Sequence, residues 1–86
     1  MPEIARFNGI VIKMYYGDKD HNPPHAHASF GSHAASVDLN SGEILAGKLP
    51  TPVRKQVKEW VMNNKDELME IWNSQEFHRI EEKEPK

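Results

Sequence analysis

The sequence of 86 residues contains no cysteine, which excludes disulfide bonds and thiolate chemistry. It has no apolar run approaching the roughly 20 residues of a membrane span, so we expect no membrane segment. The first residues lack the charged start and long apolar run of a signal peptide, and a cytoplasmic location is therefore expected. No phosphate-binding glycine loop, dinucleotide fingerprint or serine or cysteine nucleophile motif is present, so the common signatures of enzymes are missing.

The charge of the chain is small and unevenly distributed. The formal net charge of −2 and the pI of about 6.2 argue against a strongly basic nucleic-acid-binding protein. Residues 1–63 nevertheless hold seven Lys or Arg against six Asp or Glu, whereas residues 64–86 hold four against seven. The first part of the chain is therefore compatible with a local basic patch.

A chain of this length has room for one domain. We expect this domain over residues 1–80 and a flexible acidic tail over residues 81–86, with fraying from Ile80 onward. A domain this small buries only about 60–65% of the surface that its unfolded chain exposes. Further burial against a partner would stabilise it, and a homodimer is among the expected assemblies.

The N-terminal segment predicts a β-hairpin. Asn8-Gly9 separates two apolar-rich runs over residues 4–7 and 10–16, and both turn positions of such a hairpin need positive φ. A two-residue turn pairs the strands from Phe7 with Ile10 out to Ile4 with Lys13. The expected core face carries Ala5, Phe7, Ile10, Ile12, Met14 and Tyr16, and the other face carries Ile4, Arg6, Val11, Lys13 and Tyr15.

The middle of the chain predicts more strands. Residues 17–24 are rich in Gly, Asp, Asn and Pro and indicate a loop. Alternating strands over residues 25–30 and 33–39, joined by a turn at Gly31-Ser32, place His27 opposite Ser36 and His25 opposite Asp38. A turn over residues 40–42 and a short strand over residues 43–46 complete the sheet.

Two helices are expected after the sheet. Thr51 is the predicted N-cap of the first, with proline following it, and the apolar stripe of that helix includes Trp60. Asn64 and Glu67 predict a second cap and a helix through Trp72 towards Phe77. Both tryptophans are expected in the core. The predicted fold class is α+β, an antiparallel sheet of about five strands (a meander of hairpins) followed by two C-terminal helices packed on one face.

Four of the five histidines gather in the segment from Asp18 to His33, DKDHNPPHAHASFGSH. The imidazoles of His25 and His27 are expected side by side, because alternate residues of a strand project from one face. Asp38, opposite His25, is expected to fix the tautomer of that ring. If the sheet is continuous, the same face of the first hairpin adds Arg6, Lys13 and Tyr15.

Four segments resemble a family of small bacterial proteins known as domain of unknown function 4160. They are PEIARFNGIVIKMYY, HNPPHAH, SVDLNSGEILAGKLP and VRKQVKEWVMNNKDELMEIW, and the joint presence of the first two is the most specific feature. The family has no established activity. Its genes often lie beside another short gene, so the resemblance implies a toxin–antitoxin-like component whose partner is the product of the adjacent gene. The family commonly has an aromatic residue where this chain has Ala26, which implies a flatter, less apolar surface near the histidines.

The first interpretation of the histidine face is RNA binding, with a metal-independent ribonuclease-like activity as its enzymatic form. Catalysis would depend on His25, His27 and Asp38. The positive side chains of Arg6 and Lys13 would bind phosphate, and Tyr15 would stack on a base.

A second interpretation is a transition-metal site. His21, His25 and His27 would bind zinc, helped by Asp18, Asp20 or Asp38, since imidazole and carboxylate groups are suitable ligands. The spacing of these histidines is not diagnostic of a metal site.

In a third interpretation the histidines are solvated strand residues, or they hydrogen-bond the turn around Pro23-Pro24. The face would then serve a protein partner or no ligand. The alternation of residues 25–30 also predicts that His25 and His27 contribute little to the core.

Overall fold

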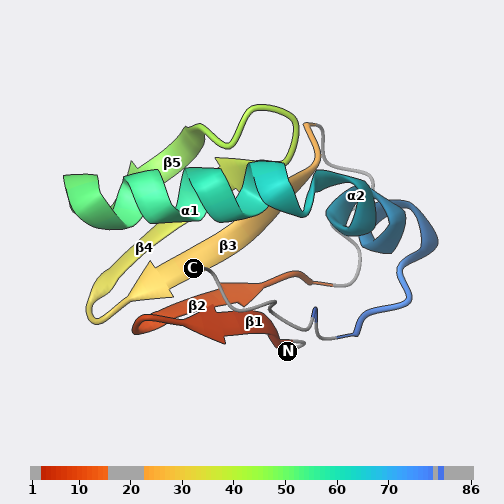
Figure 1. The fold of residues 1–86 in the computed structure, drawn as a ribbon, viewed down its shortest axis with the longest axis horizontal. Helices are drawn as coiled ribbons and strands as arrows, with labels where there is room; N and C mark the ends of the chain where they lie inside the picture. The colour runs from red at the N-terminus through yellow and green to blue at the C-terminus, as the bar shows by residue number, and fades with distance from the viewer. Residues whose placement is uncertain (1–2, 16–22, 79, 81–86) are drawn as a thin grey trace.

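The computed structural model describes residues 3–15, 23–78 and 80. Five antiparallel strands form one sheet in chain order: β1 (Glu3–Phe7), β2 (Ile10–Lys13), β3 (His25–Phe30), β4 (His33–Asp38) and β5 (Ile44–Lys48). The helices α1 (Thr51–Asn63) and α2 (Lys65–Ser74) follow. Figure 1 shows α1 crossing one face of the sheet and α2 lying beside its end. The predicted α+β fold, a meander followed by two helices, is confirmed.

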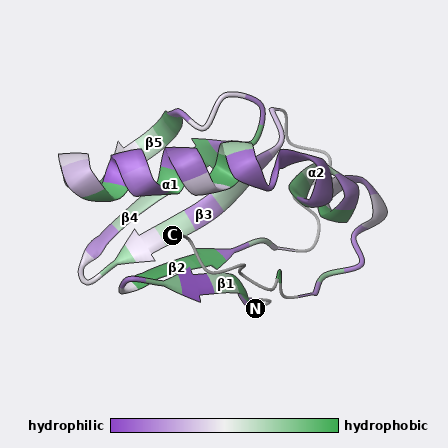
Figure 2. Ribbon diagram, viewed as in Figure 1, coloured by the Kyte–Doolittle hydropathy of each residue, from purple (hydrophilic) through white to green (hydrophobic). Residues whose placement is uncertain are grey.

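The core lies between the sheet and the helices. Its strand residues include Ile10, Ile12, Ala26, Ala28 and Val37, each at most 1% exposed. The helical stripe is visible in Figure 2, where hydrophobic and hydrophilic residues alternate along α1. Both tryptophans belong to this core, as the periodicity predicts. The buried residues of the two helices are Val53, Val57, Trp60, Val61, Leu68, Ile71 and Trp72.

The β1–β2 hairpin forms around Asn8 and Gly9, which have φ of 51° and 79° as the predicted turn requires. Pairing follows the predicted register from Phe7 and Ile10 as far as Ala5 and Ile12. The predicted pairing of Ile4 with Lys13 is wrong, because a bulge between Glu3 and Ala5 pairs Glu3 with Lys13. The extra residue turns Ile4 into the core, where it is fully buried.

The β3–β4 hairpin has the predicted register. His27 pairs with Ser36 and His25 with Asp38, and Gly31 has a φ of 59° in the turn. The last strand begins one residue later than predicted and runs two residues further, to Lys48. Gly47 in that strand has a φ of 85°.

The helix termini differ from the predicted caps. Pro50 occupies the N-cap of α1 without a side-chain hydrogen bond, so the predicted capping by the Thr51 hydroxyl is wrong. Asn64 is the N-cap of α2, but its side chain donates to the Trp60 carbonyl at 2.9 Å and leaves the helix start uncapped. The second helix ends at Ser74, because Gln75 adopts the left-handed conformation with a φ of 61°.

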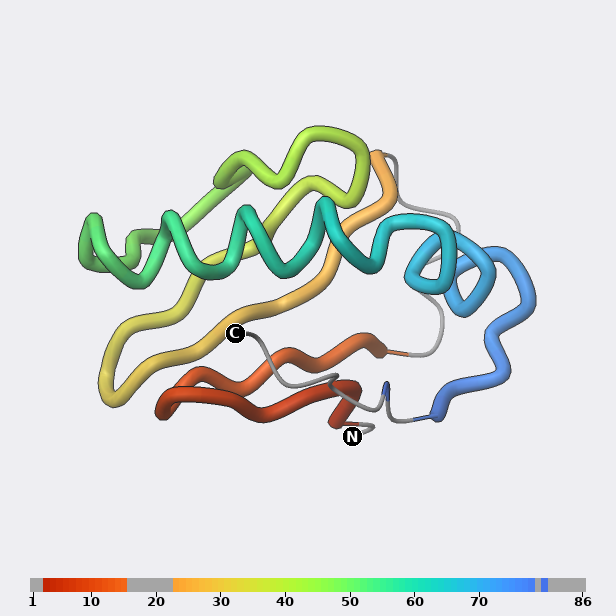
Figure 3. The backbone as a smooth tube through the Cα atoms, viewed as in Figure 1, coloured from red at the N-terminus to blue at the C-terminus, as the bar shows by residue number. Residues whose placement is uncertain are grey.

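The segment after α2 returns to the first strand, as Figure 3 shows. The amide of Ile80 donates to the Ile4 carbonyl at 2.8 Å, and Ile80 is 5% exposed. The prediction that fraying begins at Ile80 is therefore wrong at that residue. The predicted tail over residues 81–86 and the predicted core position of Tyr16 lie outside the described residues.

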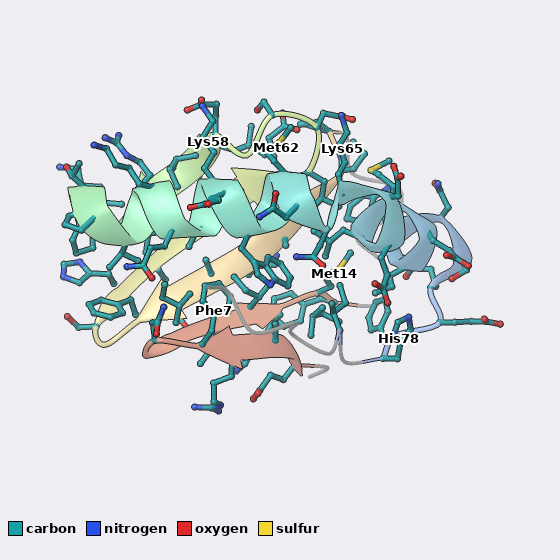
Figure 4. The ribbon with its side chains drawn as sticks, in the orientation of Figure 1. Phe7, Met14, Lys58, Met62, Lys65 and His78 are labelled. Atoms are coloured by element: carbon teal, nitrogen blue, oxygen red, sulfur yellow. The ribbon has the colours of Figure 1, made fainter. Side chains whose placement is uncertain are left out.

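Two lysines tie the helices to the β4–β5 loop, and Figure 4 shows them along one side of the molecule. The ammonium of Lys58 donates to the Glu43 carboxylate, and Lys65 donates to the Asn40 carbonyl at 3.2 Å. The hydrogen bond and charge of Lys58 lower the pKa of the Glu43 carboxyl, which is solvent-exposed. None of the described helices is long and apolar enough to cross a membrane.

Candidate functional site

The face of the sheet opposite the core is lined by alternate residues of all five strands, and we call it the open face. One cross-strand row runs from Lys13 to His27, Ser36 and Ala46. A neighbouring row contains Arg6, Val11, Ser29, Ala34 and Lys48. The first hairpin is thus continuous with the histidine strand, as the predicted patch requires.

A depression of about 370 Å³ lies on the open face. Its rim carries the ammonium of Lys13, the phenol of Tyr15 and the imidazole of His27. Small residues make its floor, so a ligand can approach the backbone of the sheet closely. The floor residues are Ala28, Ser29, Ala34, Ala35, Ser36, Ala46 and Gly47.

Four aromatic rings form a continuous series from this rim to the core. The ring centroids of Tyr15 and His27 are 4.6 Å apart, and those of His27 and His25 are 5.1 Å apart. The His25 ring also lies 5.1 Å from the ring of Trp72 on α2. His27 therefore contacts the depression directly, whereas His25 lies behind it, between His27 and the buried tryptophan.

The tautomer of His25 follows from its hydrogen bond. Its Nδ1 lies 3.0 Å from the Pro23 carbonyl oxygen, which can only accept, so Nδ1 carries the hydrogen. In the neutral ring the lone pair is consequently on Nε2. This contact to the turn before β3 agrees with the third interpretation drawn from the sequence.

Asp38 pairs with His25 through the backbone, but its carboxylate faces the following turn. Oδ1 accepts the amide of Asn40 at 2.7 Å and that of Ser41 at 3.4 Å. These bonds stabilise the β4–β5 loop. Among the described residues, the Pro23 carbonyl rather than this carboxylate holds the His25 ring.

Arg6 lies on the open face one row away from Lys13. Its Nη2 and Nε donate to the Glu3 carboxylate at 2.9 and 3.2 Å. These bonds, and then the charge of Glu3, raise the pKa of the Arg6 guanidinium. Arg6 is therefore ion-paired, whereas neither Lys13 nor Lys48 forms an ion pair with another described residue.

The structure describes only some of the residues that the sequence predicts as zinc ligands. His25 and His27 are brought together, while His21, Asp18 and Asp20 lie outside the described residues. Within residues 3–15, 23–78 and 80, no group of three or more histidine or acidic side chains is arranged to hold a metal ion. The zinc interpretation stays a prediction.

Sequence reasoning missed two features of the site. The contact of His25 with Trp72 depends on where α2 packs, and an apolar helical stripe does not specify that. The small floor contributed by Ala46 and Gly47 depends on the register of β5, which the turn residues alone do not fix.

The fold and the open face define a small α+β domain with a five-stranded antiparallel sheet, helices on one face and a depression on the other. The chain belongs to the family described as Domain of unknown function (DUF4160), whose model matches residues 9–73. The match covers every element from β2 to most of α2 and leaves out β1. The comparisons with curated proteins and with solved structures give no match.

Proposed function

We propose that the open face binds single-stranded RNA. The observation that carries this proposal is the Tyr15–His27 ring pair, 4.6 Å apart, beside Lys13 on the rim of the depression. Aromatic rings on a sheet stack with unpaired bases, and an adjacent ammonium attracts the phosphate that joins them. The family assignment assigns no activity, so the proposal depends on the chemistry of this face.

Local charge supports a phosphate-bearing ligand despite the net charge of −2. Lys13 and Lys48 contribute cations without a described ion-pair partner. The carboxylates of the strands are engaged elsewhere, since Glu3 pairs with Arg6 and Asp38 accepts the turn amides. The open face is therefore more positive than the whole chain.

The size of the depression favours a single unpaired nucleotide over a duplex. Its volume of about 370 Å³ is near the lower end of the roughly 300–1,000 Å³ of small-molecule sites. Ser29 and Ser36 offer hydroxyl groups on the floor that both donate and accept hydrogen bonds. Such groups tolerate different bases, so we expect little sequence preference.

Fluorescence polarisation with a short labelled single-stranded RNA of mixed sequence tests this proposal. Lys13→Ala and Tyr15→Ala should each weaken binding, the tyrosine change by about 1–3 kcal/mol as for a lost base stack. Affinity should fall with rising salt, because phosphate contacts release counterions. Matched controls are Lys55→Ala on the exposed side of α1 and His33→Gln at the far end of β4, both of which should bind like the wild type.

A protein from an adjacent gene, as in a toxin–antitoxin-like cytoplasmic pair, is the alternative occupant of this face. Co-purification with that product, repeated with Tyr15→Ala, would identify it. If the wild-type chain binds no RNA while Tyr15→Ala abolishes capture of the protein, the RNA proposal is wrong.

A further inference from the structure

We propose that the open face also cleaves the RNA strand that it binds, with Tyr15 and His27 as an acid–base pair. The inference depends on the proposed function, because the scissile phosphate must lie on this face. It goes beyond binding, since it gives the two rings a role in moving protons. Neither the family assignment nor the other comparisons assign a reaction to the chain.

The first support is the way the His27 ring is held. Tyr15 lies against it at a centroid distance of 4.6 Å and a tilt of 46°, and His25 meets it nearly edge-on at 5.1 Å and 77°. His25 is itself fixed by the Pro23 carbonyl and by the ring of Trp72. An imidazole restrained in this way is a better proton-transfer group than a mobile surface histidine, because catalysis depends on position.

The second support is the group next to His27 in the same row. Lys13 pairs with His27 across β2 and β3, so an ammonium and an imidazole project from one cross-strand position. Both line the depression together with the phenol of Tyr15. A phosphate seated there would meet a fixed positive charge, a base and an acid.

The reaction is transfer of the phosphoryl group to the neighbouring 2′-hydroxyl. The His27 imidazole takes the proton of that hydroxyl while the 2′-oxygen forms a bond to phosphorus. The bond from phosphorus to the 5′-oxygen of the next nucleotide breaks, and that oxygen takes the proton of the Tyr15 phenol. Lys13 stabilises the charge that develops on the non-bridging oxygens.

The products are a 2′,3′-cyclic phosphate and a 5′-hydroxyl, so atoms and electrons balance without a further reactant. The protein is left with a His27 imidazolium beside a Tyr15 phenolate. Because these two rings are in contact, the proton returns from the imidazolium to the phenolate, directly or through one water. The starting protonation states are thereby restored.

The test compares variants that keep both rings but remove the groups that move protons. Tyr15→Phe lacks only the phenol hydroxyl, and His27→Phe keeps a flat ring without nitrogens. Both should still bind the labelled single-stranded RNA, and both should cleave it about 100-fold or more slowly than the wild type. The same strand with deoxyribose throughout should bind without being cleaved, because it has no attacking hydroxyl.

His33→Gln, purified in parallel, should cleave like the wild type, and mass spectrometry should find the cyclic phosphate. If the wild type binds the RNA and leaves it uncleaved, cleavage is wrong and the proposed binding function stands. If no preparation binds RNA, both proposals are wrong. Equal cleavage by the wild type and the Phe variants, or cleavage of the deoxyribose strand, overturns the acid–base pair.

Discussion

The ring of His25 lies 5.1 Å from the ring of Trp72, so a histidine of the sheet contacts the buried tryptophan of the last helix. His25 also donates a hydrogen bond to the Pro23 carbonyl. These contacts give His25 a structural role that the alternation of β3 does not predict. They also fix the ring against which His27 rests.

His25→Ala should therefore destabilise the domain by about 1–2 kcal/mol, from one hydrogen bond and one ring contact. His33→Ala, at an exposed position, should change stability by no more than about 0.5 kcal/mol. Urea unfolding of both variants measures the difference. Equal stability of the two would show that the contact with Trp72 contributes nothing to the fold.

Patterns with a local physical cause were predictable from the sequence. The Asn8-Gly9 turn follows from the need for positive φ, and the pairing of His27 with Ser36 follows from a two-residue turn and strict alternation. The proximity of His25 to His27 needs only the geometry of a strand. The site residues that were predictable are thus those set by one strand or one hairpin.

The features that were not predictable depend on contacts between distant segments. The bulge that buries Ile4 places that residue where the Ile80 amide reaches its carbonyl, some 76 positions later in the chain. The contact of His25 with Trp72 likewise needs α2 to be packed in place. Neither follows from periodicity, because periodicity reports which face is apolar and not what covers it.

Gly47 should tolerate no side chain. A Cβ there would lie 2.3 Å from the Ala34 carbonyl oxygen and 2.8 Å from the Ala35 Cα, and the backbone has a φ of 85°. Gly47→Ala should therefore cost about 2 kcal/mol or more, from the left-handed conformation and from overpacking. Gly31→Ala is the matched control, since its φ is 59° with no atom within 4 Å, and it should cost about 1 kcal/mol. Thermal melts in which Gly47→Ala is the milder change would contradict this geometry.

Ile80 should contribute to stability although it follows the last helix. Its side chain is 5% exposed and belongs to the core, and its amide bonds Ile4. Ile80→Ala should lower the free energy of unfolding by about 2 kcal/mol. Glu76→Ala, an exposed position in the same segment, should be nearly neutral. If Ile80→Ala is as stable as the wild type, this segment does not pack against β1.

Zinc should leave the melting temperature unchanged if the open face is an RNA site. Only a ligand that binds the folded state raises that temperature. His21 lies outside the described residues, so His21→Ala is the informative variant for the alternative. If zinc raises the melting temperature of the wild type but not that of His21→Ala, the metal interpretation is favoured.

The Glu43–Lys58 pair predicts a specific dependence of stability on pH. The hydrogen bond from Lys58, and then its charge, hold the folded pKa of Glu43 below its ordinary value of 4.5. A depressed carboxyl pKa means that the folded state favours the carboxylate, so the stabilisation is present above pH 4.5 and is lost as pH falls through the folded pKa. Both side chains are at least half exposed, so salt should screen the effect.

Glu43→Gln removes the titrating group and nearly conserves its shape. Urea unfolding at neutral pH should show the variant to be slightly less stable than the wild type, and the gap should close at a pH below the folded pKa of Glu43. The same gap at neutral pH should shrink in concentrated sodium chloride. A difference between the two chains that is constant across this pH range would mean that the loss comes from packing of the side chain against Lys58, and the electrostatic account of the loop would be wrong.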